Sequence, residues 1–431
     1  MYPDFYHLLK DWFGLELPVL GLLKTFGFMV AMAFLAAGMV LRAELKRKET
    51  EGLLPYTLED QVTGKPVGWQ DYFLTALLSF LAGYKVIGMI LNFQEATADP
   101  LSYLTTRKGN LNAGIALCLV ALTWKYFEDR EARKTGLQQK KVKVYPRHRV
   151  GDFAVIAAIG GFVGAKIFNA FETWDQFIQD PLGNLFSSAG LTFYGGLIVA
   201  TLALWYYSRK IKMDFRHLCD ATAPALILAY GIGRLGCQVS GDGDWGIYNA
   251  AYMTNEQGQI QSNLQPFDSL VAQHHEHVYR HFDAKEKIPH ASFQAPSFLP
   301  VWLVAYNYPN NVNNIGEPLK GCKGAYCSVL PIPVFPTPIY EFLMSLLIFG
   351  ILWRLRRQWD TPLSIFSVYL IFNGIERFLI EQIRVNSEYD LGWIQPTQAE
   401  IIAVAISLTG ILLFAFRKKI DSVVSKANTL P

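Results

Sequence analysis

Charged residues are scarce in this chain. Asp, Glu, Lys and Arg make up only 17% of its 431 residues, whereas a soluble protein of this length carries about a quarter. Hydrophobic residues account for 51% of the sequence and aromatic residues for 14%. The formal net charge is only +3 and gives no indication of nucleic-acid binding. This composition argues against an ordinary soluble protein and favours a membrane protein.

The apolar residues are gathered in nine blocks of roughly 16 to 25 residues, which can span a bilayer as helices. Buried core helices of a soluble protein could explain one or two such blocks, but hardly nine. The blocks are 17–41, 71–93, 111–127, 151–171, 191–207, 220–239, 339–353, 361–380 and 400–416. We therefore predict an all-α, polytopic integral membrane fold with about nine transmembrane helices.

Lysine and arginine in the short loops predict the orientation of these helices. Loops that alternate along the chain fall into two sets, of which one holds 23 basic residues and the other 3. The basic set is 42–48, 125–149, 208–216, 354–360 and 417–419, and the other set is 93–110, 172–190 and 381–399. We predict an outside N-terminus and a cytoplasmic C-terminus. The first block lacks a basic n-region and a small-residue cleavage site, so we expect a span there and not a signal peptide.

The stretch YGIGRLGCQVSGDGDWG, residues 230–246, spaces its glycines as a dinucleotide-binding fingerprint does. That fingerprint needs a preceding strand and a soluble βαβ unit, but here DATAPALILAY precedes it inside an apolar block. Glycines for close helix packing are the alternative. Packing does not explain Arg234, because a charged residue at the edge of a span is costly and usually marks a ligand, a partner or a pathway.

An internal repeat appears when the chain is shifted by 81 positions. Residues 71–126 then align with 152–207 without a gap, with 12 identities in 56 positions. Lys85 meets Lys166, and Gly83 meets Gly164. We interpret this as a duplicated two-span hairpin. The second copy leads into the arginine stretch, so we expect it to be the working copy and the first to be scaffold.

Two further stretches carry charge at the predicted outer membrane level. FPTPIYEFL contains Tyr340 and Glu341, and NGIERFLIEQIR ends the eighth block. Asn373, Arg377, Glu381 and Arg384 recur at i, i+4, i+8 and i+11, which predicts one shared helical face. An interfacial ion pair with snorkelling arginines is the alternative. Seven charged residues from different blocks are predicted at the same outer membrane level, which argues against a simple interfacial ion pair. They are Arg234, Asp242, Asp244, Glu341, Arg377, Glu381 and Arg384.

These motifs resemble those of the bacterial prolipoprotein diacylglyceryl transferase family. FYGGLI, GRLGCQVSGDGDWG, PTPIYE and ERFLIEQIR occur in the family's order and approximate spacing, and QPTQAEIIAVAISLTG is similar to its last-helix motif. The resemblance covers residues 17–41 and 151–420, apart from 247–334. It implies an inner-membrane enzyme without cofactor or metal. Such an enzyme moves the sn-1,2-diacylglyceryl group of phosphatidylglycerol to the lipobox cysteine of a preprolipoprotein, the first step of bacterial lipoprotein maturation.

The residues suit this chemistry. The substrate thiol is the nucleophile, so the enzyme needs no cysteine of its own, and guanidinium groups suit a leaving phosphate. By the resemblance, Arg234 and Arg377 contact the phosphate and Glu381 fixes Arg377. The expected catalytic residues are Arg234, Arg377, Tyr194 and Glu381. The expected substrate-binding residues are Phe26, Gly195, Gly196, Gly233, Asp242, Asp244, Gly246, Tyr340, Glu341 and Arg384.

The sequence departs from the family in several places. Tyr194 stands where many members have a histidine proposed as the base, and an unperturbed tyrosine is a poor base at neutral pH. A carboxylate or water is the alternative acceptor of the proton. Phe26 replaces a tyrosine, Cys237 replaces a common asparagine, and SGDGDWG is one residue longer than the related NGELWG. Gly195 and Gly196 are expected to leave room for lipid or peptide.

We predict five segments in the chain. These are an N-terminal arm with the first span (1–70), the extra hairpin and a basic cytoplasmic loop (71–150), a first part of the catalytic core (151–246), an extracytoplasmic head loop (247–334), and a second part of the core with a short tail (335–431). In the head loop, Cys322 and Cys327 are candidates for a local disulfide. His274, His275, His277 and His281 are interpreted as a hydrated surface strip, with a metal cluster as the alternative.

The competing functions are a catalytically inactive paralogue, which Tyr194 keeps open, and a lipid-binding or transport protein. A transporter would show matching halves across its whole fold, whereas this repeat covers only two helices. A CDP-alcohol phosphotransferase would need clustered aspartates that hold metal, and the sequence contains no such array.

Overall fold

A computed structural model of the chain describes residues 1–98, 103–104, 106–186, 190, 192–279, 288–386, 389 and 395–429. Their contacts form two compact units, and each unit is described by itself. The first unit comprises Met1–Leu8, Lys24–Leu45 and Arg216–Pro431, and the second comprises Leu9–Leu23 and Lys46–Phe215.

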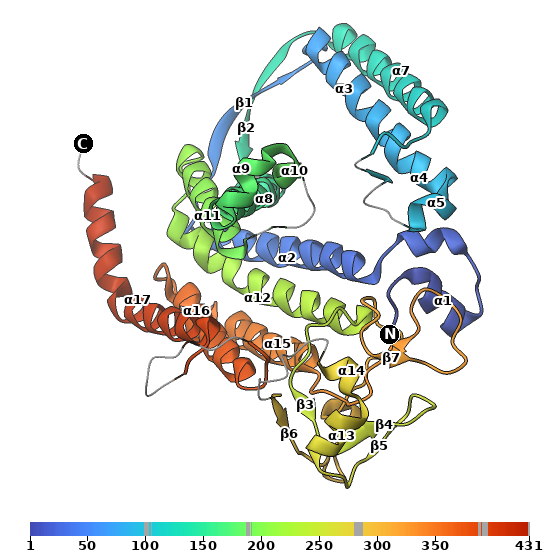
Figure 1. Cartoon of the computed structure of the whole chain (residues 1–431). Coiled ribbons are helices and arrows are strands. Elements are labelled where there is room, and N and C mark those ends of the chain that lie inside the picture. The colour runs from blue at the N-terminus through green and yellow to red at the C-terminus, as the bar shows by residue number, and fades with distance from the viewer. Residues whose placement is uncertain are drawn as a thin grey trace. The chain divides into compact units, whose positions relative to one another are not determined.

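Helices occupy all nine apolar blocks. They are α2 (Thr25–Thr50), α3 with α4 (Trp69–Ala82, Gly88–Leu91), α7 (Leu111–Thr135), α8 (Val150–Glu172), α11 (Phe193–Lys210), α12 (Phe215–Ser240), α15 (Thr337–Leu355), α16 (Ser364–Glu381) and α17 (Gln398–Thr429) (Figure 1). Among the described residues, five segments are long and apolar enough to cross a membrane: 25–50, 69–91, 146–172, 337–355 and 398–424. The chain is therefore a multi-pass membrane protein. The helices α7, α11, α12 and α16 do not meet that measure of length and apolarity.

The fold is mostly helical, as the sequence predicts, but strands that were not predicted also form. In the second unit, β1 (Thr57–Thr63) and β2 (Gln138–Val144) pair as an antiparallel ribbon (Figure 1). In the first unit, the connection between α12 and α15 contains β3 (Tyr248–Asn249), β4 (Tyr252–Thr254), β5 (Ile260–Ser262), β6 (His290–Ala291), β7 (Glu317–Pro318) and β8 (Ser328–Val329). All of these strands pair two by two. The strands β3 to β8 have only two or three residues each, which is too short for a periodic pattern.

The two hairpins of the second unit share contacts at the 81-residue offset. The ammonium of Lys85 donates to the Tyr103 carbonyl at 3.0 Å, and that of Lys166 donates to the Asn184 carbonyl at 3.2 Å. After each first helix comes a short one at the same offset, α5 (Phe93–Ala98) and α9 (Trp174–Gln179). These recurring contacts support the duplication that the sequence suggests.

The glycines at that offset also make close helix contacts, with carbonyl groups that lie 82 positions apart. A Cβ added to Gly83 on the first hairpin would lie 2.4 Å from the Ala113 carbonyl, and one added to Gly164 on the second would lie 2.4 Å from the Gly195 carbonyl. Only glycine allows the paired helices to approach this closely.

Buried polar contacts hold the helices of the first unit in register. Asp220 of α12 is 2% exposed, and its carboxylate accepts the backbone N–H groups of Leu363 and Phe366 at 3.0 and 2.9 Å. It thereby satisfies donors at the start of α16 that helix geometry leaves without partners. Glu44 of α2 forms a buried ion pair with Arg356 at 2.7 Å.

The head loop packs around an apolar core of its own. Leu270 of α13 (Phe267–Gln273) and Val278 of α14 (His275–Val278) lie in it with Leu330 and Ile332. Asn311 is fully buried, and its amide donates to the carbonyls of Tyr308 and Ile315 and accepts the Ile315 N–H. The loop is therefore a folded segment.

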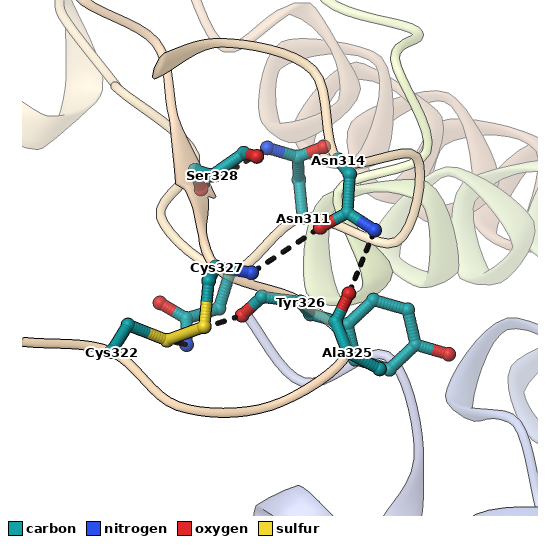
Figure 2. The surroundings of a disulfide bond; sticks show 8 residues. Asn311, Asn314, Cys322, Ala325, Tyr326, Cys327 and Ser328 are labelled. Carbon is teal, nitrogen blue, oxygen red and sulfur yellow. Dashed lines mark hydrogen bonds between the residues drawn. A yellow bond between two sulfur atoms is a disulfide. The ribbon is translucent and has the colours of Figure 1, made fainter. Parts of the chain in front are cut away.

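A disulfide joins Cys322 and Cys327, the pair that the sequence offered as candidates (Figure 2). Asn314 spans the bridged turn, because it donates to the Ala325 carbonyl at 2.8 Å and accepts the Cys327 N–H at 3.2 Å. The turn presents Tyr326, whose hydroxyl accepts a hydrogen bond from Lys24 at 3.1 Å. Lys24 also pairs with Asp4 at 3.3 Å, so this turn anchors the N-terminal arm.

Replacing Cys322 and Cys327 together by serine should release this turn. Closure of so short a loop contributes about 2 kcal/mol, and we expect faster amide hydrogen exchange in residues 2–8 and 311–328. Cys118→Ser, at a free cysteine of α7, is the matched control. Unchanged exchange in residues 2–8 of the double variant would show that the disulfide does not support the arm.

Candidate functional site

Backbone hydrogen bonds bring three of the motifs together in the first unit. The Gly246 N–H donates to the Phe335 carbonyl at 2.9 Å, and the Phe335 N–H donates to Ile247 at 3.1 Å. The Ile247 N–H donates to the Ile383 carbonyl at 2.9 Å. Residues after α12, before α15 and after α16 are thus tied at one place.

Glycines shape the turn that follows α12. Gly241 and Gly243 have φ values of +66° and +96°, which other residues rarely adopt. A Cβ at Gly246 would lie 2.7 Å from the Ile383 carbonyl, so glycine there permits the close backbone approach. The Thr337 hydroxyl donates to the Asp244 carbonyl at 3.1 Å. The turn therefore presents Asp244 at the start of α15.

Two arginines and two carboxylates form a closed ring of alternating charge. Asp244 makes ion pairs with both Arg234 and Arg384. Glu341, whose side chain is fully buried, lies 3.3 Å from Arg234 Nε and 3.8 Å from Arg384 Nη1. We call these four residues the charge ring. Burying Glu341 without such partners would be very unfavourable.

A second ion pair lies on the last turn of α16. Arg377 contacts Glu381 at 2.8 Å. The other oxygen of Glu381 accepts from Asn386 at 2.6 Å and from the Thr397 hydroxyl at 2.7 Å. Thr397 and Glu400 exchange hydrogen bonds at the start of α17, as in a capping box. Glu381 is thus held on three sides, and it fixes one edge of Arg377.

The expectation that Arg384 continues the helical face of Arg377 is wrong. The helix α16 ends at Glu381, and Arg384 lies in the turn beyond it. That turn directs Arg384 to Asp244 and Glu341 of the charge ring. Among the described residues, no ion pair joins Arg384 to the Arg377–Glu381 pair, because helical spacing does not extend past the end of the helix.

Sequence reasoning missed the polar groups beneath the ring. The Tyr230 hydroxyl donates to Glu341 at 2.6 Å, and the Arg234 guanidinium lies 5.1 Å from the centre of the Tyr230 ring. Glu376 is 2% exposed and interacts electrostatically with Glu341 and Arg234. Its Oε1 has no hydrogen-bond partner in the part of the chain that the structure describes. In the sequence, only their positions could have indicated them: Tyr230 lies one helical turn before Arg234, and Glu376 directly precedes Arg377.

The other expected residues of the first unit have lesser roles. The Asp242 carboxylate accepts the Asp244 N–H at 3.2 Å and forms no ion pair among the described residues, so it shapes the turn. The Tyr340 hydroxyl donates to the Leu303 carbonyl. Phe26 is 41% exposed and packs against Gly236 of α12. A Cβ at Gly233 would meet no atom within 4 Å.

Tyr194, Gly195 and Gly196 belong to the second unit. Tyr194 lies in the first turn of α11 and is 41% exposed. A Cβ at Gly195 would lie 2.3 Å from Phe168 Cβ, and one at Gly196 would lie 2.8 Å from the Gly161 carbonyl. Helix α8 therefore packs closely against both glycines, and their contact with lipid or peptide stays a prediction.

The histidines do not form a surface strip. His277 is 4% exposed, and His274 pairs with Glu317 at 2.6 Å, while His281 lies outside the described residues. Within the described ranges, no group of three His, Cys, Asp or Glu residues is placed to hold a metal ion.

The site thus offers three guanidinium groups of unequal availability. Within the described part of the chain, Arg234 and Arg384 each form ion pairs with two carboxylates, whereas Arg377 forms an ion pair with one and is 28% exposed. An entering anion would meet Arg377 first and would have to compete with Asp244 for the other two. Guanidinium groups in such a poorly hydrated setting bind phosphate strongly.

Comparisons with known proteins agree with the motifs. A family described as prolipoprotein diacylglyceryl transferase matches residues 113–416. Over 273 residues the chain is 29% identical to a phosphatidylglycerol–prolipoprotein diacylglyceryl transferase of Leptospira interrogans, covering 57% of this chain and 65% of that protein. It is 28% identical over 263 residues to a protein of the same name from Xylella fastidiosa, covering 59% and 72%.

A shorter segment is more similar. Over 88 residues the chain is 39% identical to a protein of that name from Dehalococcoides mccartyi, which covers 20% of this chain and 34% of that protein. The chain thus spans just under two thirds of the Leptospira relative's length.

Replacing Glu341 by glutamine should destabilise the protein strongly. The variant removes a fully buried charge and leaves the half-buried Arg234 and Arg384 with one carboxylate instead of two, and breaking a buried ion pair costs about 3 kcal/mol. The midpoint of denaturation in detergent measures this loss. Glu256→Gln is the matched control, because the Glu256–Lys320 pair is exposed and should contribute nothing measurable. Equal midpoints for the two variants would contradict a stabilising role of the ring.

Proposed function

The chain belongs to the prolipoprotein diacylglyceryl transferase family, and from that premise we propose that it transfers the diacylglyceryl group of phosphatidylglycerol to the lipobox cysteine of a preprolipoprotein in a bacterial inner membrane. The observation that carries the proposal is the meeting of three family motifs in the charge ring and the adjoining Arg377–Glu381 pair.

The reaction requires a nucleophile, a proton acceptor and a stabilised leaving group. The thiolate of the acceptor cysteine attacks the glycerol carbon that carries the phosphate ester. A carbon–sulfur bond forms as the carbon–oxygen bond breaks, and the electron pair leaves on glycerol phosphate. The thiol proton passes to a base or to water. Because the phosphate gains negative charge in the transition state, fixed guanidinium groups accelerate the step.

We assign different parts to Arg377 and Arg234. Arg377 is the first contact of the phosphate, since it has the fewest carboxylate partners. Arg234 supplies a second guanidinium, whose position the charge ring fixes before substrate arrives. Glu381 and Glu341 are positioning residues that hold these arginines. Preorganised charge of this kind needs no rearrangement at the moment of reaction.

The proton acceptor has two candidates on the chain. Glu376 supplies a carboxylate oxygen without a hydrogen-bond partner beside Arg234, and Tyr194 holds the position of the family histidine. A carboxylate is an ordinary general base when it lies within reach of the proton, so Glu376 is the better candidate.

Transfer should be measured first with purified protein in detergent. Phosphatidylglycerol and a lipobox peptide are added, and mass spectrometry detects diacylglyceryl on the peptide cysteine. We expect Arg234→Ala and Arg377→Ala to lose transfer at least about 100-fold, the usual effect of removing one such donor. Glu376→Gln should lower kcat, and Tyr194→Phe should keep most of the activity.

The outcomes separate the proposed function from its competitors. Transfer by the wild-type protein that survives Arg377→Ala would remove the phosphate role of that residue. No transfer by folded protein that still binds phosphatidylglycerol would favour the inactive paralogue or the lipid-binding protein. Loss of activity in Tyr194→Phe, with Glu376→Gln unaffected, would move the proton to the phenol.

We also propose nine spans with the N-terminus outside and the C-terminus in the cytoplasm. The nine helices in the apolar blocks and the bias of basic residues between loops support this topology. It places residues 247–334, with their disulfide, on the outer side, where disulfides persist.

Cysteine labelling tests the topology in intact cells. In a background that carries serine at Cys118, Cys219 and Cys237, Ser262→Cys should react with a membrane-impermeant maleimide. Gln139→Cys, on the basic loop, should react only after the cells are permeabilised. The reverse pattern would invert the topology, and reaction of both in intact cells would overturn the number of spans.

A further inference from the structure

The head loop contains a long stretch without formal charge. Residues 288–316 include no Asp, Glu, Lys or Arg, although these residues make up 17% of the chain. Four large apolar side chains of this stretch are nevertheless exposed: Phe298 is 84% exposed and Trp302 49%, and Phe293 and Val301 are exposed as well. Single exposed apolar residues are common on protein surfaces, but several of them together in an uncharged segment mark an interaction site.

A fully buried side chain closes this stretch into a compact loop. The amide of Asn249, on β3, donates to the Phe293 carbonyl at 2.9 Å and to the Val304 carbonyl at 3.0 Å. Its side-chain oxygen accepts the Phe293 N–H at 3.1 Å. Both ends of residues 293–304 are thus tied to one residue, as in an Ω-loop. We call residues 293–304 the aromatic loop.

The aromatic loop has an inner and an outer side. On the inner side, Ala295 and Leu299 pack against a buried cluster that contains Tyr252, whose hydroxyl accepts the Ala295 N–H at 2.9 Å. On the outer side, Phe298 and Trp302 are four residues apart in a stretch of successive turns and are both exposed. The core of the head loop thus covers the inner side of the aromatic loop and leaves its outer side uncovered.

The aromatic loop is fixed to the beginning of a membrane-crossing helix. The hydroxyl of Tyr340, in the first turn of α15, donates to the Leu303 carbonyl. Just after the loop, Tyr306 and Val334 exchange backbone hydrogen bonds at 2.9 and 3.0 Å, and Val334 shortly precedes α15. Residues 337–355 are long and apolar enough to cross a membrane. The aromatic loop therefore lies at the level at which α15 enters the bilayer.

The chemistry of the outer side fits a lipid surface. Tryptophan and phenylalanine are favoured in the headgroup region of a bilayer, because part of that region is apolar and part of it is hydrated. A segment without formal charge enters it without the large cost of removing water from an ion. A soluble partner would have to reach a level at which lipid is already present. The position and the composition of the loop thus favour the same partner.

We propose that the aromatic loop inserts its outer side into the headgroup region of the bilayer, in the leaflet where α15 begins, and so docks the head loop on the lipid surface. Phe298, Val301 and Trp302 form the inserted surface. The proposed topology makes this leaflet the outer one. Because Tyr340 contacts the loop and Glu341 follows it in the sequence, the inserted loop sets the charge ring at the level of the lipid phosphates.

Spin labelling measures the depth of the loop. Full-length protein with serine at Cys118, Cys219 and Cys237 receives either Val301→Cys or the matched control Gln257→Cys, an exposed position in the turn between β4 and β5. A nitroxide is attached without reductant, and the protein is reconstituted in liposomes of phosphatidylethanolamine and phosphatidylglycerol. Collisions with oxygen, which concentrates in lipid, and with a water-soluble nickel chelate report the surroundings of each label.

We expect the label at position 301 to collide more with oxygen than with the nickel chelate, and the label at position 257 to show the reverse. Adding Phe298→Ser and Trp302→Ser to Val301→Cys should return its label to water, because these side chains supply most of the apolar area that enters the lipid. A label that stays in lipid in this variant would overturn the role of the aromatic side chains.

Two outcomes with the otherwise unchanged loop overturn the proposal. One is a label at position 301 that collides mainly with the nickel chelate, both in liposomes alone and after a lipobox peptide is added. The other is a label that leaves water only when the peptide is added, because the loop would then be a surface for the peptide and not for lipid.

Tryptophan fluorescence tests the insertion with the native cysteines in place and without any need for transfer. The emission of the wild-type protein minus that of Trp302→Phe is the emission of Trp302. We expect this difference to fall when lipids with brominated acyl chains replace ordinary lipids in the liposomes. A fall supports the insertion even if the protein transfers no diacylglyceryl group. An unchanged difference overturns the insertion even if transfer succeeds.

Discussion

The fully buried carboxylate of Glu341 is the group on which the rest of the site depends. A carboxylate in that position is tolerated only if cations and donors surround it. Arg234, Arg384 and the Tyr230 hydroxyl provide them. Arg234 and Tyr230 lie on α12, Arg384 lies in the turn after α16, and Glu341 itself lies near the start of α15. Satisfying this one carboxylate therefore fixes the ends of three helices. The same arrangement leaves Arg377, with its single carboxylate partner, as the guanidinium most open to a ligand.

The loops around the ring give the site its second property, which is shape. Backbone hydrogen bonds tie the glycine turn after α12 to the chain before α15 and after α16, while the head loop packs its own core above them. Arg384 belongs to the charge ring and also lines an adjoining cavity, whose other side chains are mainly aliphatic and aromatic. Charged and apolar groups thus meet at one place.

Much of this arrangement could be predicted from the sequence, and the remainder has physical reasons. The apolar blocks became helices because their length and composition leave few alternatives in a membrane, and Arg234, Asp244 and Glu341 stood out as charges at block ends. Arg384 was placed on the wrong surface, because its helix stops at Glu381. A sequence does not tell which neighbour lies beside a glycine, so the packing of α8 against Gly195 and Gly196 could not be foreseen. Tyr230 matters through its contact with Glu341, 111 positions away, which local spacing does not reveal.

Lys85 and Lys166 have a consequence for how such a chain grows. Each ammonium is received by carbonyl groups of the loop in its own hairpin, so each hairpin enters the membrane with its charge already accommodated. Among the described residues, these hydrogen bonds lie within the hairpin of each lysine. Such a hairpin can be duplicated or lost during evolution, because the polar contacts of the neighbouring helices do not depend on it. A lysine in an apolar helix is unfavourable by itself, but a lysine that is satisfied within its own hairpin allows the hairpin to be duplicated as a unit.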